Sequence, residues 1–294
     1  LSSAMSTKGI ILAGGSGTRL SPITNAISKQ LLLVYDKPMI YYPLSTLMLS
    51  GINDILIICT KENFALFNCL LGDGIKYGIQ IQYKIQDKPY GLAHSFILGE
   101  EFIGDSSLIL VLGDNLFHGN NFINQIKNVI SIGKPTIFAY QVDDPERYGV
   151  VEFSSKGNVI GIEEKPKSPK SNFAITGIYY YDNSVISKAK SLKPSKRGEL
   201  EITDINNLYL MESLLKVEKI GRGISWLDTG TFESMHDASS YVRTIQNRQG
   251  YKIGCLEEVA WRNGWIDNNK VLELANSQIK SEYGKYLLKL IKEK

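Results

Sequence analysis

The sequence predicts an α/β protein with a Rossmann-like, mostly parallel sheet flanked by helices. Along the first half of the chain, apolar runs typical of strands alternate with segments whose apolar residues follow helical spacing. The run "SLILVLGDN" at 107–115 is continuously apolar, which is typical of a strand buried on both faces, whereas the run at 79–86 alternates apolar and polar residues. A loop with three glycines directly follows the first run.

The first half is predicted to alternate strands and helices in order. Strands are expected at 9–13, 54–60, 79–86 and 107–115, and helices at 38–51, 63–74 and 91–103. In the first of these helices the apolar residues are spaced to share one face, and Gly51 ends the segment.

The pattern changes after "PTIFAYQV" at 135–142, where a β-hairpin-rich part begins. A hairpin is expected from 149–153 and 159–164, joined by a Gly157-Asn158 turn. The order then predicted is a strand at 175–182, a helix around 201–215, a strand at 214–220, an apolar segment at 223–230, and helices from Phe232 onward with breaks at Gly250, Gly254 and Gly264. With no repeat or linker, residues 5–294 are expected to form a single domain, in parts of about 5–140, 141–230 and 231–294.

Composition is that of an ordinary globular protein, since 43% of the 294 residues are hydrophobic and 21% are charged. A formal net charge of +3 is too balanced to indicate binding to nucleic acid or a membrane surface. The three cysteines lack metal-type spacing, Cys59 is expected in the core, and a reducing, cytoplasmic location fits. "LSSA" before Met5 is expected to be a cloning remnant.

The glycine loop "LAGGSGTRL" is predicted to hold phosphate. Gly14, Gly15 and Gly17 allow backbone N–H groups to approach an anion, a following helix N-terminus would add its dipole, and Arg19 offers a fork of donors. The loop matches neither G-x-x-x-x-G-K-[ST] nor G-x-G-x-x-G. A plain strand-to-helix turn would also use glycine, but it has no need of the arginine.

"LAGGSGTRLSPIT", followed by "ISKQLLLVYDKPMIYYPL", resembles the signature of the sugar-1-phosphate nucleotidylyltransferases. The segments "LVLGDNLFHG", "RYGVVEF", "EEKPKSPKSNFAITGIYYYD", "RGELEITDIN", "WLDTGTFESM" and "CLEEVAWRNGWI" are most similar to the branch that uses dTTP and glucose 1-phosphate. The resemblance spans the chain from Lys8 to the C-terminal helices. It implies a nucleotide-binding core, a sugar-binding part and a C-terminal helical region.

The resemblance implies the reaction of dTTP with α-D-glucose 1-phosphate, giving dTDP-glucose and pyrophosphate with Mg²⁺. It also implies service to dTDP-sugar biosynthesis of the L-rhamnose type, a homotetramer, and inhibition by a nucleotide sugar at a second site. Two alternatives stay open: a UTP-dependent uridylyltransferase, and a catalytically silent regulatory subunit of the same fold. Such a silent copy would have no chemical reason to keep all of Arg19, Lys29, Asp114, Lys165 and Asp228.

The residue roles below are carried over from the resemblance. Catalytic roles fall on Arg19, Lys29 and Lys165. Nucleotide-binding roles fall on Leu12, Gly14, Gly15, Gly17, Thr18, Arg19, Gln30, Gln86, Gly91 and Asp114. Sugar-phosphate-binding roles fall on Tyr148, Gly149, Glu164, Lys165, Ile175, Thr176, Tyr179 and Trp226. Metal-ligand roles fall on Asp114 and Asp228, and a second nucleotide site is assigned to His118, Gly119, Arg222, Glu258 and Arg262.

The chemistry is consistent with these residue types. The nucleophile belongs to the sugar phosphate, so the site must supply positioning and positive charge rather than a serine, cysteine or histidine nucleophile. Taken singly, strand-end aspartates are also common caps, strand tyrosines are commonly core residues, and arginines are commonly surface ion pairs.

Two local features qualify the resemblance. Lys165 is expected in an extended conformation because Pro166 follows it, yet strict alternation would place Glu164 and Lys165 on opposite faces. Both can reach one ligand only if the strand is bulged or twisted there. In the segment that faces the base, the family usually shows S-P-D/N-G-L-A-Q-A, whereas this chain has Tyr90, His94 and Ser95 at departing positions.

Overall fold

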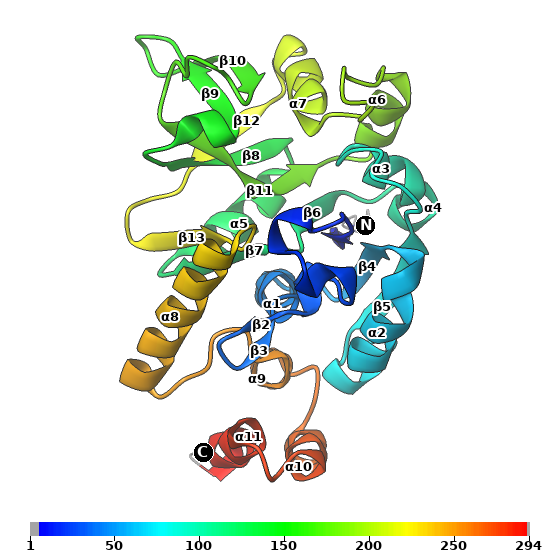
Figure 1. Cartoon of the computed structure of the whole chain (residues 1–294), viewed down its shortest axis with the longest axis vertical. Coiled ribbons are helices and arrows are strands. Elements are labelled where there is room, and N and C mark those ends of the chain that lie inside the picture. Colours follow the sequence, from blue (N-terminus) through cyan, green and yellow to red (C-terminus); the bar gives the residue numbers. More distant parts are fainter. Residues whose placement is uncertain (1–5, 293–294) are drawn as a thin grey trace.

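The computed structural model describes residues 6–292, so the expected remnant at 1–4 lies outside the described residues. Its centre is a nine-stranded sheet in the order β10-β9-β11-β6-β1-β4-β5, with β8 also beside β11 and β12 beside β8. Figure 1 shows the β9–β10 hairpin at one end of the molecule and the C-terminal helices α10 and α11 at the other.

The first half of the sheet is parallel, as predicted. It consists of β1 (Lys8–Ala13), β4 (Asp54–Cys59), β5 (Gln80–Ile85) and β6 (Leu108–Leu112). Successive residues of each strand enter different cores, because side chains alternate across a sheet. Ile11 packs with helices α1 (Tyr41–Leu49), α2 (Lys61–Leu71), α5 (Phe122–Ile132) and α9 (Leu256–Arg262).

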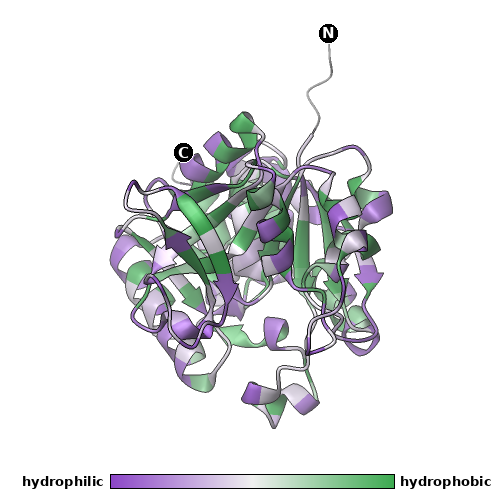
Figure 2. Cartoon of the chain, turned by 90° about the horizontal axis from the view of Figure 1, so that it is seen from above, coloured by the Kyte–Doolittle hydropathy of each residue, from purple (hydrophilic) through white to green (hydrophobic). Residues whose placement is uncertain are grey.

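The opposite face of the sheet carries its own core. Ile10 packs there with α3 (His94–Leu98), α4 (Glu100–Ile103), α6 (Val185–Ser191) and α7 (Ile202–Met211). Figure 2 shows hydrophobic residues along the central strands and hydrophilic residues on outer helices and loops. The predicted α/β class, with helices on both faces of a central sheet, is confirmed.

The second half of the sheet is largely antiparallel. It contains β8 (Thr136–Gln141), β9 (Gly149–Phe153), β10 (Val159–Glu164), β11 (Phe173–Tyr181) and the edge strand β12 (Lys216–Lys219), which alone here pairs in parallel. The predicted hairpin is present, and Gly157 supplies the positive φ of its turn.

Some elements differ from the prediction. The segment expected as one helix over 91–103 forms the two short helices α3 and α4, which meet at Gly99. A strand absent from the prediction, β7 (Asn115–Gly119), pairs antiparallel with β13 (Ile224–Asp228) in a small second sheet. Helices α5 and α6 were not predicted either, and the short strands β2 (Leu33–Val34) and β3 (Lys37–Pro38) form a third sheet.

The C-terminal region is helical, with breaks at the predicted glycines. It contains α8 (Phe232–Gln249), α9, α10 (Asn268–Ser277) and α11 (Glu282–Lys292). Thr231 and Ser234 form a reciprocal cap that begins α8. Cys59 is fully buried as predicted, and all three cysteines are free thiols. Over residues 6–292, no helix combines the length and the apolar character needed to cross a bilayer.

Candidate active site

A cleft follows the carboxyl ends of β1, β5 and β6, where open α/β sheets place their ligands. It contains two adjoining cavities, of about 550 Å³ and about 230 Å³. Four residues line both cavities: Leu92, Leu112, Asp114 and Glu199. The two spaces are therefore compartments of one cleft with Asp114 at their boundary.

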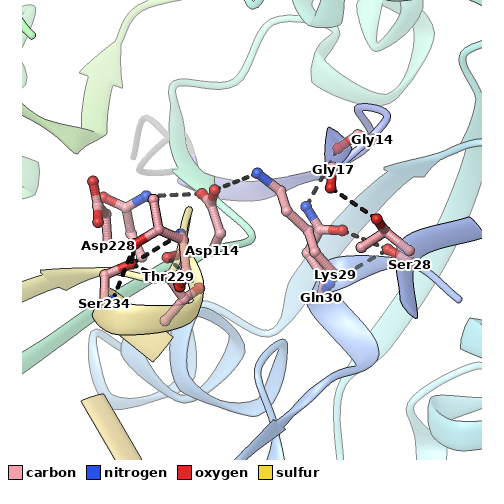
Figure 3. Close-up of polar contacts among 12 residues, drawn as sticks. Gly14, Gly17, Ser28, Lys29, Gln30, Asp114, Asp228, Thr229 and Ser234 are labelled. Atoms are coloured by element: carbon pink, nitrogen blue, oxygen red, sulfur yellow. Dashed lines mark hydrogen bonds and ion pairs between the residues drawn. The ribbon is translucent and has the colours of Figure 1, made fainter. Parts of the chain in front are cut away.

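The glycine loop forms one wall of the smaller cavity. Gly15 and Gly17 have φ values of 95° and 58°, which a side chain would strain. Gln30 supports the loop, since its Nε2 donates to the Gly14 carbonyl oxygen at 3.3 Å. The Ser28 hydroxyl in turn donates to Gln30 Oε1 at 2.5 Å (Figure 3). The loop backbone is thus held from behind by buried side chains.

The prediction that a helix directly follows the glycine loop is wrong. The chain instead forms three short 3₁₀ turns, Thr18–Leu20, Ile23–Asn25 and Lys29–Leu31, and α1 begins only at Tyr41. Pro22 has no backbone N–H and restricts the residue before it, so a helix cannot run through this position from Thr18. Any phosphate here would be held by loop N–H groups and side chains, without the dipole of a long helix.

Lys29 and Asp114 form an ion pair at the boundary between the cavities. The Lys29 Nζ lies 2.5 Å from Asp114 Oδ2, and the pair bridges the glycine-loop side of the cleft to the end of β6 (Figure 3). Burial acts to raise the pKa of the Asp114 carboxyl, but the Lys29 charge and the hydrogen bonds from Lys29 and Asn115 outweigh it. The pKa of Asp114 is therefore lowered, and the group is ionised at neutral pH.

Asp228 lies beside Asp114 because β13 pairs with β7. Asp228 is opposite Asn115 in the register, and both the backbone N–H and the hydroxyl of Thr229 donate to the Asp114 carbonyl oxygen at 3.1 Å. Asp228 Oδ2 accepts a hydrogen bond from the Tyr148 hydroxyl at 3.2 Å. The structure thus brings the two predicted metal ligands to one cavity.

Two half-buried carboxylates on the wall of the larger cavity fit Mg²⁺, which is commonly held by one or two carboxylates plus substrate phosphates. In the described part of the chain, no group of three or more carboxylate, histidine or cysteine side chains gathers into a protein-only metal site. The donor set therefore suits a metal that completes its coordination with substrate oxygens and water.

Asn115 orients Asp114 through a chain of hydrogen bonds. Trp226 Nε1 donates to Asn115 Oδ1 at 2.6 Å, and Asn115 Nδ2 donates to Asp114 Oδ1 at 3.0 Å. Gly177 allows this arrangement, because a Cβ there would lie 2.4 Å from Asn115 Oδ1. Strand β11, through Gly177, and the small sheet of β7 and β13 together fix the direction of the Asp114 carboxylate.

The larger cavity contains Glu164 and Lys165 side by side. The predicted extended conformation of Lys165 is wrong: its φ is 44°, in the left-handed region, where the chain leaves β10. This turn overrides the strand alternation and explains how both residues line the same cavity. Thr203 donates to Glu164 Oε2 at 2.7 Å, and Gly149 leaves space for that carboxylate, since a Cβ would lie 3.3 Å from the same oxygen.

Arg19 and Lys165 are exposed cations on the walls of the larger cavity. Within residues 6–292 neither forms an ion pair, unlike Lys29. The Arg19 guanidinium passes directly over Gly230, where a Cβ would lie 2.9 Å from one of its nitrogens. Both side chains can therefore bind an anion without giving up a protein partner.

The predicted residues divide between the two compartments. The smaller cavity is lined by Leu12, Gly14, Gly15, Lys29, Gln30, Gln86, Gly91 and Asp114. The larger cavity is lined by Arg19, Asp114, Tyr148, Gly149, Glu164, Lys165, Ile175, Thr176, Tyr179, Trp226 and Asp228. Gly17 and Thr18 line neither cavity. Gly17 instead shapes the loop, because its carbonyl oxygen accepts from the Thr24 hydroxyl at 2.8 Å.

Four of the five residues of the predicted second site also come together. His118, Gly119, Glu258 and Arg262 line a separate cavity of about 310 Å³ between β7 and the C-terminal helices. Arg222 does not line it and is exposed in the turn between β12 and β13. Arg262 donates to Glu258 Oε1 at 2.8 Å, so the arginine is already paired with a carboxylate.

Several cleft residues were not predicted from the sequence. The segment 197–206 was matched as "RGELEITDIN" without roles for single residues, yet it lines much of the larger cavity through Arg197, Glu199, Glu201, Ile202, Thr203 and Asn206. Asn115 and Arg147 were also missed. Each directly adjoins a predicted residue, Asp114 or Tyr148, and that adjacency was the available signal.

Comparison with known proteins shows the family to which the chain belongs. Residues 8–245 match the family model described as Nucleotidyl transferase. A glucose-1-phosphate thymidylyltransferase of Neisseria meningitidis serogroup A is 58% identical over 97% of this chain and 100% of its own length. One from Mycobacterium tuberculosis is 55% identical over 97% of this chain and 99% of its own.

Solved structures agree as well. A Bacillus anthracis protein assigned to the glucose-1-phosphate thymidylyltransferases and solved with sucrose superimposes with a TM-score of 0.75 at 43% identity, over 81% of this chain and 96% of its own. A UDP-glucose pyrophosphorylase bound to UDP-glucose shares the fold, with a TM-score of 0.71 at 23% identity, over 82% of this chain and 100% of its own. From the motifs, the cleft and these full-length matches, the chain belongs to the glucose-1-phosphate thymidylyltransferases of the nucleotidyl transferase family.

Proposed function

We propose that this chain transfers a thymidylyl group from dTTP to α-D-glucose 1-phosphate, giving dTDP-glucose and pyrophosphate. The observation that carries the proposal is the two-compartment cleft with Asp114 at its boundary. A triphosphate in the smaller compartment and a sugar phosphate in the larger one would meet at this carboxylate. Relatives at 55% and 58% identity over nearly their whole lengths support the choice of substrates.

The reaction needs two anions to be held in line. A phosphate oxygen of the sugar substrate forms a bond to the α-phosphorus of dTTP, while the bond from that phosphorus to the pyrophosphate oxygen breaks. Lys165 positions the sugar phosphate, and Lys29 supplies positive charge at the boundary of the two compartments. Arg19, on the wall of the larger cavity, holds the phosphates that leave where they extend from the smaller compartment past Asp114. Glu164, oriented by Thr203, accepts hydrogen bonds from sugar hydroxyls. Catalysis is then mainly positioning and charge stabilisation.

Asp114 and Asp228 would hold Mg²⁺ at the boundary of the two compartments. When bound, the ion would neutralise charge on the phosphates of both reactants. The Lys29–Asp114 ion pair must then open or share its carboxylate. Asn115 and Thr229 would keep the Asp114 segment in place during this exchange, since they contact Oδ1 and the backbone oxygen rather than Oδ2.

A coupled assay of pyrophosphate release tests the proposal. With glucose 1-phosphate and Mg²⁺, dTTP is expected to turn over faster than UTP, and a chelator is expected to stop the reaction. Faster turnover with UTP would favour the uridylyltransferase alternative, for which the similarity to the UDP-glucose pyrophosphorylase extends to the fold alone. No sugar nucleotide from either triphosphate would overturn the proposal.

We also infer that the third cavity binds a nucleotide sugar that regulates the enzyme. Support comes from its size of about 310 Å³, its separation from the cleft, and the meeting of His118, Gly119, Glu258 and Arg262. Calorimetric titration with dTDP-glucose should show two sites per chain, and one site in Arg262→Ala. Assembly as a homotetramer, service to a dTDP-sugar pathway and a cytoplasmic location stay predictions of the sequence.

A further inference from the structure

His94 lies against the amide of Gln86 at the wall of the smaller cavity. The Nδ1 atom of the imidazole is 3.1 Å from Gln86 Nε2. Gln86 directly follows β5, is 6% exposed and lines the cavity, whereas His94 is half-buried at the start of α3. Histidine occupies the position at which the family that the sequence resembles usually has glutamine.

The orientation of the Gln86 amide decides what the cavity presents to a ligand. Its Oε1 lies toward Gly14, 3.4 Å from the position of a Cβ on that glycine, and Gly14 lines the same cavity. Within residues 6–292, the contact with His94 is the one hydrogen bond of this side chain. Because a carboxamide has one donor end and one acceptor end, whichever atom bonds the imidazole leaves the other facing the cavity.

The imidazole is neutral at physiological pH. Burial lowers the pKa of His94, and no charged side chain contributes to that shift. Two side chains contact the imidazole ring. Gln86, from the end of β5, forms the hydrogen bond, and the ring of Tyr90, in the preceding loop, has its centroid 5.0 Å away. A neutral imidazole carries its proton on one nitrogen only. With that proton on Nε2, Nδ1 accepts from Gln86 Nε2 and leaves Oε1 as the acceptor at the cavity.

We propose that His94 is a positioning residue that fixes the Gln86 amide with Oε1 toward the nucleotide, selecting a base with a ring N–H between two carbonyl groups. This inference rests on the proposed function, which takes dTTP as a substrate. Thymine offers such an N–H donor to Oε1. Cytosine places an unprotonated ring nitrogen there, so acceptor would face acceptor and the base would be disfavoured.

Protonation of His94 should reverse the arrangement. A protonated Nδ1 can only donate, so Gln86 must turn Oε1 toward it and present Nε2 to the cavity. The KM for dTTP should therefore rise as the pH falls through the pKa of His94, while the KM for glucose 1-phosphate should not follow it. A residue with a purely structural role would not raise the KM for dTTP while leaving the KM for glucose 1-phosphate unchanged.

Two variants test the inference. His94→Leu removes the acceptor, so the KM for dTTP should rise about tenfold and the preference for dTTP over dCTP should narrow, with the KM for glucose 1-phosphate unchanged within about twofold. His94→Asn places Oδ1 near the former Nδ1 position and does not titrate. It should keep a KM for dTTP near the wild-type value at neutral pH and lose the rise in KM at acidic pH.

Long-range ¹H–¹⁵N NMR of wild-type protein gives a readout independent of turnover. At neutral pH the His94 signals, assigned by their loss in His94→Asn, should show an unprotonated Nδ1. A protonated Nδ1, or His94→Leu with wild-type KM and base preference, would overturn the inference while the proposed function stands. If His94→Leu does not fold, equal pH profiles of wild type and His94→Asn overturn it. Wild-type protein inactive with dTTP would overturn the proposed function and this inference together.

Discussion

The three cations predicted to be catalytic, Arg19, Lys29 and Lys165, differ in what they contact. Lys29 is paired with Asp114, whereas Arg19 and Lys165 are exposed and form no ion pair in the part of the chain that the structure describes. Arg19 and Lys165 are therefore ready to bind phosphate directly. Lys29 lowers the pKa of Asp114 and so helps to keep this carboxyl ionised.

Asp114→Asn should lower kcat at least about a hundredfold, because it removes a charge at the boundary of both compartments. The Asn side chain keeps the oxygen that accepts from Asn115, so the thermal unfolding midpoint should change little. Steady-state kinetics and thermal unfolding measure the two effects. Glu152→Gln, in an exposed pair with Lys170 outside the cleft, is the control and should retain wild-type turnover. Wild-type turnover in Asp114→Asn would contradict its role.

Lys165→Ala should raise the KM for glucose 1-phosphate by roughly tenfold to a hundredfold, because a charge-assisted contact with phosphate is lost. The KM for dTTP should change much less. Initial-rate measurements with each substrate varied in turn provide the test. Lys167→Ala removes a nearby exposed lysine that does not line the cavity and should leave both constants unchanged. An equal effect of Lys165→Ala on both substrates would place Lys165 elsewhere in the reaction.

At the residue scale, the sequence predicted positions better than conformations. The strand-end location of Asp114 follows from a short local pattern, and the structure places it there. The positive φ of Lys165 was not predictable, because Pro166 favours extended backbone and only the packing of β10 overrides that preference. Thr203 was missed because its contact with Glu164 joins segments that are distant in the sequence.

At the scale of elements, the cleft is closed on one side by two segments that bind each other. The N–H of Leu200 donates to the Tyr90 carbonyl oxygen at 2.8 Å, and the N–H of Ala93 donates to the Leu200 carbonyl oxygen at 3.1 Å. Gly91 makes this approach possible, since a Cβ there would lie 2.3 Å from the Leu200 oxygen. The wall of the smaller cavity thus depends on one glycine.

Gly91→Ala should therefore destabilise the protein and weaken substrate binding. Its φ of 98° is strained for alanine, and the new methyl group would push the segment around Leu200 away. We expect a loss of about 2 kcal/mol or more in the free energy of unfolding, measured by urea denaturation. Gly250→Ala is a matched control, with φ of 75° in the left-handed region and open space around the Cβ position, so it should cost only about 1 kcal/mol. Equal costs would mean that the contact with Leu200 is unimportant.

The secondary-structure predictions were wrong for segments whose conformation depends on tertiary contacts. The helix over 91–103 divides at Gly99, which packs closely against Leu56 and Ile10 of the sheet. Strand β7 has no signal of its own, because it exists by pairing with β13 far along the chain. The strands at 9–13 and 54–60 were predictable, since each is a continuous apolar run that the sheet buries on both faces.

At the scale of the whole molecule, a buried carboxyl joins the C-terminal helices to the rest of the fold. Glu257, in α9, is 3% exposed and accepts a hydrogen bond from the Tyr283 hydroxyl of α11 at 2.5 Å. Burial raises the pKa of Glu257, although the Tyr283 hydrogen bond and the Lys76 charge oppose the shift. The folded state therefore favours the protonated form.

This shift makes stability depend on pH in a defined direction. Above the ordinary value of 4.5, the folded protein binds more protons at Glu257 than the unfolded chain, so the contribution of this group to stability falls as the pH rises. Glu257→Gln removes the dependence, and its stability relative to wild type in urea unfolding should increase as the pH rises above the ordinary value of 4.5.

Glu282→Gln is the matched control for this prediction. It is an exposed carboxyl on α11 whose pKa is lowered by Lys285, so its removal should bring no gain as the pH rises. If Glu257→Gln and Glu282→Gln respond to pH in the same way, the buried carboxyl does not control this part of the stability.

Helix α9 also limits how far the chain can be truncated without losing part of the core. Its Leu256, Val259 and Ala260 complete the core around α1, although they lie beyond residue 245, where the family match ends. A fragment trimmed to the matched region would leave the apolar side of α1 without a cover and should aggregate when expressed alone. The end of the family match therefore does not coincide with the end of the folded unit.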